Sequence, residues 1–291
     1  MDLQSALNSA ARLFLKEGSE VDVQMDPHDR SAGHGYDVRV GCRYGGKRLS
    51  GLAWDRSLFR GFLRALLELG EEIVRVKWQL SSRSGLAGGV LKGPTWFRAR
   101  GELVERDAFF YHYRNRIPFH RAGVRRLDGV VLDVYELESA EPNLKVALVM
   151  AQTVEEEEGF LHFATASSFD IESASLRAAR EYLSLHRYLE ANHQRLTQRA
   201  ADANECRRDL SLFHFKACSD PRNFERFRFL RAGNEKPAFG RCSTPVVWRR
   251  VQYPSPVRGF RFLRAESDQL QKIEFGLPEA TDGPPLFHPF W

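Results

Sequence analysis

The stretch Gly101-Glu-Leu-Val-Glu-Arg-Asp-Ala-Phe-Phe-Tyr-His-Tyr-Arg-Asn-Arg-Ile-Pro118 decides how the rest of the chain is interpreted. It follows the glycine-rich turn Ser84-Gly-Leu-Ala-Gly-Gly89 and a helix that Gly93-Pro94 is expected to open, because proline is favoured at a first helical position. Glu102 and Glu105 are three residues apart, which places both carboxylates on one face of that helix. The turn has backbone N–H groups that can approach an anion, although a glycine-rich turn is more often only a turn.

A weak internal repeat extends outward from this stretch. Three short triplets are each followed by a glutamate fifteen residues after the last alanine. A strand is predicted before each copy and a helix after it, which indicates an α/β or α+β domain. The triplets and their glutamates are Gly51-Leu52-Ala53 with Glu68, Gly85-Leu86-Ala87 with Glu102, and Ala164-Thr165-Ala166 with Glu181.

Apolar patterning and capping residues predict the elements between these copies. Asp55 is expected to cap a helix that runs to about Glu72, and Asp170 a helix that extends towards Arg199. The acidic run 155–158, followed by Gly159, is interpreted as a solvated hairpin turn, because four adjacent carboxylates repel one another and cannot share one metal. The expected strands are residues 36–43, 73–81, 144–153, 160–166, 246–253 and 260–264.

Length and composition restrict the class of protein. The 291 residues include 43% hydrophobic and 28% charged residues, which is typical of a soluble globular chain and excludes a disordered, collagenous or coiled-coil protein. No apolar run approaches the roughly 20 residues that a membrane span needs. Residues 1–18 lack the basic leader and the cleavage site of a signal peptide and are typical of an amphipathic helix. We therefore expect a cytoplasmic protein with no membrane partner.

Charge and motif content exclude several common functions. The net charge is only +5, from 43 basic and 38 acidic residues, so no nucleic-acid partner is expected. The histidines have no metal-ligand spacing, and there is no nucleophile elbow, Walker-type loop or Rossmann fingerprint. The four cysteines include no C-x-x-C pair, which argues against a zinc site or a disulfide framework; they are Cys42, Cys206, Cys218 and Cys242.

The paired glutamates form the candidate site. Glu68 and Glu71 have the same spacing as Glu102 and Glu105, and two helices that present such pairs to each other would gather hard oxygen ligands suited to Mg²⁺ and a nucleotide phosphate. Glutamates three apart are also ordinary solvated helix positions, and spacing alone leaves that alternative open. Arg106 is either a bidentate phosphate donor or part of a surface salt bridge.

Taken in order, residues 82–118 resemble the central signature of the YcaO family. That signature is a serine or asparagine and glycine turn, a helix, then Glu-x-x-Glu-Arg-Asp-Ala with aromatics and an Asn-Arg-aliphatic-Pro ending. Residues 65–71 are similar to the family's first Glu-x-x-Glu helix, 174–181 to its third acidic helix, and 285–291 to its proline-punctuated C-terminus. The resemblance covers about residues 36–291.

This resemblance implies an α+β fold of repeated strand–turn–helix units whose sheets pack against acidic helices. Residues 1–35 are then an N-terminal helix and lead-in, and residues 36–291 are one YcaO-like domain with a proline-rich tail at 282–291. The family's acidic helices hold ATP and Mg²⁺ without a P-loop. Its members activate backbone amides of ribosomal precursor peptides, which gives azoline heterocycles or thioamides.

The resemblance also implies the site residues of this chain. The cofactor-binding residues are Glu68, Glu71, Ser84, Glu102, Glu105, Arg106 and Glu181. Among them the metal ligands are Glu68, Glu71, Glu102 and Glu105. No catalytic residue is identified.

Four positions depart from the family pattern, namely Arg64, Arg83, Pro94 and Ser184. Fewer carboxylates and more arginines are expected to weaken Mg²⁺ binding, although the arginines could hold phosphate directly. The chain is also shorter at its N-terminal side than stand-alone members. The expected partners are therefore a precursor peptide and a leader-binding or activating protein, E1-like or TfuA-like, and a homodimer stays open. The alternatives are a non-catalytic YcaO-like partner or peptide-binding scaffold, and a nucleotide-binding module of unrelated chemistry.

Overall fold

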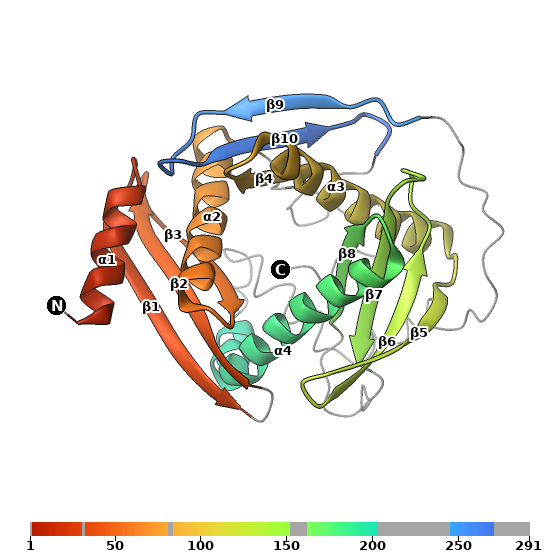
Figure 1. Cartoon of the computed structure of the whole chain (residues 1–291), viewed down its shortest axis with the longest axis horizontal. Coiled ribbons are helices and arrows are strands. Elements are labelled where there is room, and N and C mark those ends of the chain that lie inside the picture. The colour runs from red at the N-terminus through yellow and green to blue at the C-terminus, as the bar shows by residue number, and fades with distance from the viewer. Residues whose placement is uncertain (1, 31–32, 81–83, 152–161, 203–244, 271–291) are drawn as a thin grey trace. The chain divides into compact units, whose positions relative to one another are not determined.

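A computed structural model of the chain describes residues 2–30, 33–80, 84–151, 162–202 and 245–270 (Figure 1). The chain divides into two compact units. The first unit comprises Met1–Leu103 and Val247–Gln269, and the second comprises Val104–Val246 and Leu270–Trp291. Helix α3 (Lys92–Asn115) runs from the first unit into the second. The described strands form three sheets with antiparallel pairing, so the fold is α+β, as the sequence predicts.

One sheet of the first unit shares a hydrophobic core with two helices. Residues 1–18 contain the expected amphipathic helix, whose N-cap Asp2 accepts the Ser5 N–H at 2.7 Å. Val38 and Val40 point from the middle strand into this core and are fully buried. The first strand lies where the sequence predicts only a lead-in. In the order β1-β2-β3, the sheet contains β1 (Ser19–Arg30), β2 (Gly33–Tyr44) and β3 (Lys47–Asp55), and the helices are α1 (Leu3–Phe14) and α2 (Leu58–Lys77).

Helix α2 is longer than the sequence predicts, and the expected strand 73–81 is wrong. The N-cap is Ser57, whose hydroxyl accepts the Arg60 N–H, and not Asp55. Beyond the expected end of the helix, Ile73 and Val74 continue the apolar face and are buried in the core of the first unit. This burial outweighs the preference of β-branched residues for strands.

The C-terminus of α2, at Lys77, lies beyond the end at about Glu72 that the sequence predicts. The Leu80 N–H donates to the Arg75 carbonyl at 2.9 Å, and Gln79 has a φ of 50°, which together form a Schellman motif. Helix α3 ends in the same way, with Arg116 at a φ of 53°. Neither motif uses the glycine that usually marks a helix end, although Pro118 follows the end of α3 closely.

Two glycines of the repeat allow backbones to approach closely. A Cβ at Gly51 would lie 2.1 Å from the Ala65 carbonyl oxygen and 2.4 Å from the Leu69 nitrogen, so β3 packs directly on the backbone of α2. Gly85 has a φ of 74°, and a Cβ there would lie 2.5 Å from the Ala265 carbonyl oxygen. Both positions require glycine on steric grounds.

The first unit also contains a second sheet that joins distant parts of the sequence. Two of its strands lie where the sequence predicts strands 246–253 and 260–264. Phe262 is fully buried, and a Cβ at Gly70 or Gly88 would lie within 3 Å of its ring. In the order β4-β10-β9, the sheet contains β4 (Leu86–Gly89), β10 (Arg261–Glu266) and β9 (Arg249–Tyr253).

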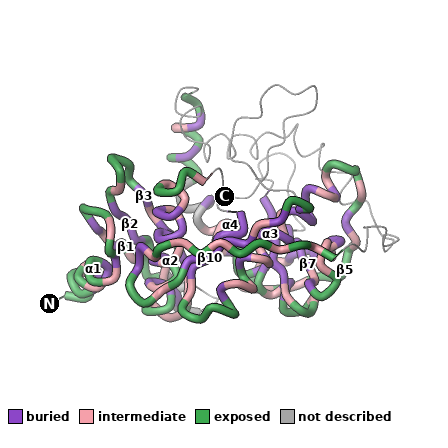
Figure 2. The backbone as a smooth tube through the Cα atoms, turned by 90° about the horizontal axis from the view of Figure 1, so that it is seen from above, coloured by how far each residue is buried: buried purple, intermediate pink, exposed green. Residues whose placement is uncertain are grey.

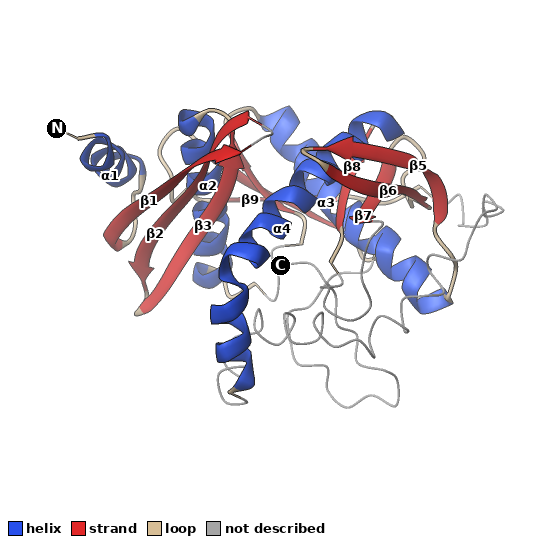
Figure 3. Cartoon of the chain, turned by 90° about the horizontal axis from the view of Figure 1, so that it is seen from below, coloured by secondary structure: helices blue, strands red, loops and turns tan. Residues whose placement is uncertain are grey.

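The second unit packs helix α4 (Ile171–Ala201) on a four-stranded sheet (Figure 3). Asp170 is the N-cap of α4, as the sequence predicts, and accepts the Ser173 N–H at 2.7 Å. The third strand is buried along most of its length (Figure 2). Asp128 and Gly129, both at positive φ, form the tight turn between the first two strands. The strands, in sheet order, are β5 (His120–Leu127), β6 (Val130–Leu137), β7 (Lys145–Ala151) and β8 (Ala164–Ser168).

The internal repeat is confirmed in the structure, with one difference. The first and third triplets lie within strands β3 and β8, and the second begins in the turn at Gly85 and continues into β4, whereas the sequence places a separate strand before each of them. Glu68, Glu102 and Glu181 lie on the following helices α2, α3 and α4. Each copy is therefore one strand and one helix.

Some expectations fall on residues outside the described ranges. These include the acidic run 155–158, the proline-rich tail 282–291, and Cys206, Cys218 and Cys242. Within the described residues, none of the helices combines the length and the apolar character needed to span a membrane.

The packing of β3 on α2 predicts a large effect of Gly51→Ala. The added methyl group would overlap the backbone of α2, so the free energy of unfolding should fall by about 3 kcal/mol. The midpoint of urea unfolding, followed by circular dichroism, measures this change. The matched control is Gly93→Ala, because Gly93 is an exposed residue of α3 with open space at its Cβ position. This control should change stability by less than about 1 kcal/mol. Equal midpoints for the two variants would contradict the assigned packing.

Candidate functional site

The residues predicted for the site divide between the two units. In the first unit, Glu68 and Glu71 lie on α2, Ser84 lies in the turn before β4, and Glu102 lies on α3. The second unit holds the remaining three residues, which are Glu105 and Arg106 on α3 and Glu181 on α4.

In the first unit, Glu71 binds the strand of the glycine-rich turn. Its side chain is on the buried face of α2, and the residue is only 5% exposed. One carboxylate oxygen accepts the Gly88 N–H at 2.7 Å. The anion that a backbone N–H of this segment contacts is therefore a carboxylate of the protein itself, that of Glu71. Ser84, at the start of the turn, is 1% exposed, whereas Glu68 is half-buried.

In the second unit, Glu105 makes the equivalent contact with the next strand. Its carboxyl group accepts the Ser167 N–H at 2.6 Å. Gly88 and Ser167 each directly follow the last alanine of a triplet, and Glu71 and Glu105 are each the second glutamate of a pair. The second glutamate of one copy thus holds the strand of the next copy. The third copy has Ser184 at this position, where the family pattern has a carboxylate or an amide.

Glu105 is the most strongly perturbed titratable group whose pKa is resolved. Its pKa is raised from 4.5 to about 8, mainly because desolvation disfavours the charged form and secondly because of the negative charge of Glu181 on α4. The charge of Arg177 and the hydrogen bond from Ser167 lower the pKa of Glu105, but by less than burial and Glu181 raise it. Glu105 therefore holds a proton in most molecules at neutral pH.

Arg177 is a site residue that the sequence reasoning missed. Its guanidinium donates to the Ser167 carbonyl oxygen, so Arg177 on α4 and Glu105 on α3 bind opposite sides of the same residue of β8. Arg177 lies four residues before Glu181, and this spacing, which places the two side chains on one face of α4, could have identified it from the sequence. Arg177 is exposed, as is Glu181, so this side of the cluster is open to solvent.

This cluster has the chemistry of a site for a divalent cation. The charge of Glu181 raises the pKa of Glu105, and a cation between the two carboxyl groups would offset this repulsion; carboxylate oxygens are ligands that Mg²⁺ accepts. Arg177 adds a fork of N–H donors that suits a phosphate. Within the described residues, no group of three or more aspartate, glutamate, histidine or cysteine side chains is close enough to bind one metal.

The positions that depart from the family pattern are now partly explained. Arg64 is exposed, donates to the Trp54 carbonyl oxygen at 3.1 Å and lies 3.6 Å from the Asp55 carboxylate. It therefore joins α2 to the end of β3. Pro94 is the third residue of α3 and is exposed, in the first helical turn where its missing N–H costs no hydrogen bond. Arg83 lies outside the described residues.

A histidine near the cluster in the sequence is structural. His112 is fully buried, and its Nδ1 lies 3.1 Å from the Ile117 carbonyl oxygen. Its Nε2 accepts the Glu138 N–H at 3.0 Å. These contacts select the neutral imidazole with the proton on Nδ1.

Comparison with known proteins finds likeness at the level of structure. No protein-family model matches the sequence, and no curated protein matches it. A chain of the E. coli Microcin synthetase McbBCD complex matches with a TM-score of 0.54 and 7% identity, over 84% of this chain and 87% of that chain. The same complex with pro-MccB17 bound matches over the same shares of the two chains, with a TM-score of 0.49 and 7% identity.

A YcaO from Methanopyrus kandleri, solved with AMPPCP and Mg²⁺, matches with a TM-score of 0.49 and 15% identity. This match covers 65% of the present chain and 66% of the other, so it spans just under two thirds of that protein. At 7% identity, the match to the chain of the McbBCD complex with a TM-score of 0.54 shows a likeness of fold.

The perturbed Glu105 predicts a specific dependence of stability on pH. The unfolded chain releases this proton near pH 4.5 and the folded chain near pH 8, so between these values the folded state binds more protons. Stability should therefore fall as the pH rises, by a few kcal/mol in order of magnitude. Glu105→Gln keeps the shape of the protonated side chain and should remove this contribution.

The measurement is the urea midpoint of wild type and Glu105→Gln across this pH range. The two proteins should have similar midpoints at the acid end, and the variant should be the more stable at the alkaline end. Glu172→Gln, on an exposed position of α4, is the matched control and should follow the wild type. Parallel curves for wild type and Glu105→Gln would show that Glu105 is not perturbed in this way.

Proposed function

We propose that this protein is an ATP- and Mg²⁺-dependent enzyme that activates backbone amides of a ribosomal precursor peptide, as a YcaO-like cyclodehydratase. The product is an azoline heterocycle or a thioamide, depending on the nucleophile that attacks. The observation that carries the proposal is the pair Glu105 and Glu181 beside Arg177 in the second unit. The resemblance of residues 82–118 to the YcaO signature and the likeness of fold to the microcin synthetase support it.

Within this proposal, the glutamates have two tasks. In the second unit, Glu105 and Glu181 would bind Mg²⁺, and in the first unit the resemblance implies that Glu68, Glu71 and Glu102 are cofactor-binding residues. Glu71 and Glu105 each use one oxygen to hold a strand N–H, and the same carboxylates would also bind the ligand. ATP, when bound, supplies the phosphoryl group that makes the amide oxygen of the peptide a leaving group.

The basic residues orient and neutralise the phosphates. Arg177 is held in place by its hydrogen bond to the Ser167 carbonyl, so little side-chain entropy is lost when its remaining N–H groups bind an anion. Arg106 is half-buried on α3 and follows Glu105 directly. Since Glu105 is protonated at neutral pH, it must release a proton before it binds a cation.

Partners follow from the same proposal. The resemblance supports a leader-binding or activating protein, E1-like or TfuA-like, beside the precursor peptide. The alternative function is a catalytically degenerate YcaO-like scaffold that binds peptide without turning over ATP. The observation that favours this alternative is Ser184, which replaces a side chain of the acidic set in the third copy.

Nucleotide binding is tested by thermal unfolding with Mg²⁺ and ATP. A ligand that is present at about a hundred times its dissociation constant stabilises the folded state by about 2.7 kcal/mol, so millimolar Mg·ATP should raise the melting temperature of the wild type. The rise should be larger at pH 8.5 than at pH 6.5, because the ionised form of Glu105 binds the cation.

Two variants make this test specific. Glu105→Gln should lose most of the stabilisation at both pH values, whereas Glu172→Gln should keep it. If Mg·ATP gives no stabilisation of the wild type at either pH, the proposed nucleotide site is wrong.

Turnover distinguishes the enzyme from the scaffold. Incubation with ATP, Mg²⁺, a co-encoded peptide and its partner protein should release ADP and change the peptide mass by loss of water or by exchange of oxygen for sulfur. Glu105→Gln and Glu181→Gln should each lower the rate by about a hundredfold or more. Stabilisation by Mg·ATP without ADP release or a change in peptide mass would favour the scaffold.

A further inference from the structure

The free edge of strand β9 is a surface that the proposed nucleotide site does not use. In the described part of the chain, β9 pairs with β10 alone, so it is the edge of the sheet β4-β10-β9 (Figure 1). Every second residue of an edge strand turns its N–H and C=O away from the sheet. β9 can therefore accept one more antiparallel or parallel strand.

The two faces of β9 present one arginine each. Arg249 lies opposite Glu266 and is ion-paired with it, although its side chain is 77% exposed. Arg250 lies opposite Ala265, on the other face, with its guanidinium 5.8 Å from the centre of the Trp96 ring. It is exposed and forms no ion pair with a described carboxylate. An added strand would meet a cation on whichever face its side chains point.

Arg250 belongs to a stack of aromatic and cationic groups. Trp96 and Trp248 contact each other edge to face with ring centres 6.3 Å apart, and Arg100 lies 4.8 Å from the centre of the Trp248 ring. A guanidinium that lies over a ring keeps its in-plane N–H groups available for a carboxylate. The stack therefore fixes Arg250 while leaving its donors accessible.

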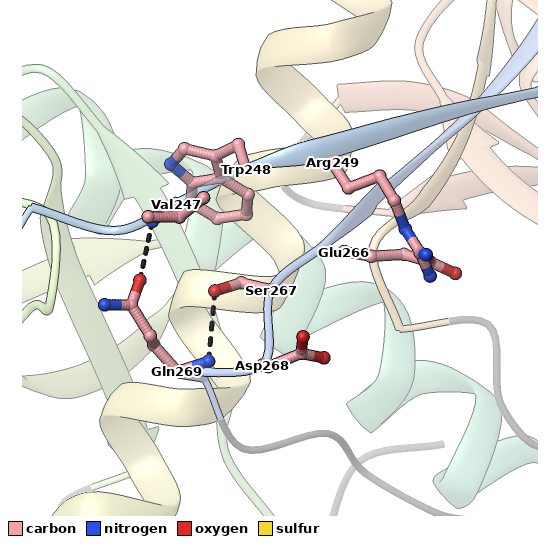
Figure 4. Close-up of a pocket in the computed structure, with 7 residues that line it drawn as sticks. All are labelled: Val247, Trp248, Arg249, Glu266, Ser267, Asp268 and Gln269. Carbon is pink, nitrogen blue, oxygen red and sulfur yellow. Dashed lines mark hydrogen bonds and ion pairs between the residues drawn. The ribbon is translucent and has the colours of Figure 1, made fainter.

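A pocket continues this surface at the start of β9. Its volume is about 380 Å³, within the range of sites that hold small ligands or side chains. Val247, which is 73% exposed, and Trp248 form its apolar side (Figure 4). The Val247 N–H donates to the Gln269 side-chain oxygen at 2.6 Å, and the Gln269 N–H donates to the Ser267 hydroxyl at 3.2 Å, so the segment after β10 is held against the segment before β9.

Charge decides which strand fits this edge. A second copy of β9 would bring four arginines into two adjacent strands, and like charges in neighbouring strands are destabilising. An acidic strand would instead place its carboxylates across from Arg249 and Arg250, where pairs of opposite charge stabilise a sheet. An apolar residue of the same strand would cover Val247 and Trp248.

The geometry points to the edge of β9 as a docking site for an extended, acidic segment of another polypeptide chain, which adds to the sheet as a fourth strand. The backbone of β9 supplies the hydrogen bonds, Arg250 selects an acidic side chain, and the Val247–Trp248 pocket takes an apolar one. This inference goes beyond the proposed function and needs no nucleotide.

The test uses a fluorescent peptide two residues longer than β9, with alternating valine and glutamate, and the full-length protein without ATP. Fluorescence anisotropy should show saturable binding that weakens with salt. Arg250→Glu should weaken it by about tenfold or more, because a cross-strand attraction becomes a repulsion. Hydrogen exchange of residues 249–253 should slow when the peptide is bound, since their outward N–H groups become bonded.

Two controls separate strand addition from general electrostatics. Arg258→Glu carries the same charge change at another exposed position of the first unit and should bind the peptide within about twofold of wild type, once the small effect of net charge is included. A peptide that is N-methylated at alternate residues on its pairing edge should not bind. The inference is overturned by absence of saturable binding, by equal losses in the two arginine variants, by equal binding of the methylated peptide, or by self-association of the protein through β9.

Discussion

A carboxyl group on a helix that accepts a backbone N–H from the following strand is the contact on which both units depend. Glu71 on α2 binds Gly88 of β4, and Glu105 on α3 binds Ser167 of β8. The Gly88 N–H and the Ser167 N–H both belong to strand residues with little solvent access, so loss of either carboxylate would leave a polar group poorly compensated. The internal repeat thus has a physical role: the glutamate of one strand–helix copy positions the strand of the next.

The same contact links fold and chemistry. A carboxyl group held for structural reasons cannot move away from its neighbours, and desolvation together with the charge of Glu181 keeps the pKa of Glu105 near 8. A cation would bind more strongly to a desolvated carboxylate beside a second negative charge than to a pair of solvated carboxylates. This is why the second unit, in which Arg177 adds donors for an anion, is the stronger basis for the proposed activity.

Much of this arrangement could be predicted from the residues. The triplets with their glutamates predicted the strand–helix copies, and Asp170 was identified as a helix cap because short polar residues before an apolar helical pattern bind its first N–H groups. The strand expected at 73–81 was wrong because Ile73 and Val74 have a local preference that tertiary burial on α2 reverses. Arg177 was missed because its importance comes from Ser167 and Glu105, which are distant in sequence.

The sequence by itself determined the α+β class, the repeat and the identity of the glutamates, because periodicity, caps and spacing are local properties. Only the tertiary structure shows which strands Glu71 and Glu105 contact. Glu71 and Glu105 are each three residues from the other glutamate of their pair, a spacing that solvated helix residues also have. Their bonds to Gly88 and Ser167 arise when separate strands pack on the helices. The pKa of a carboxyl group depends on that surrounding volume, which no window of sequence contains.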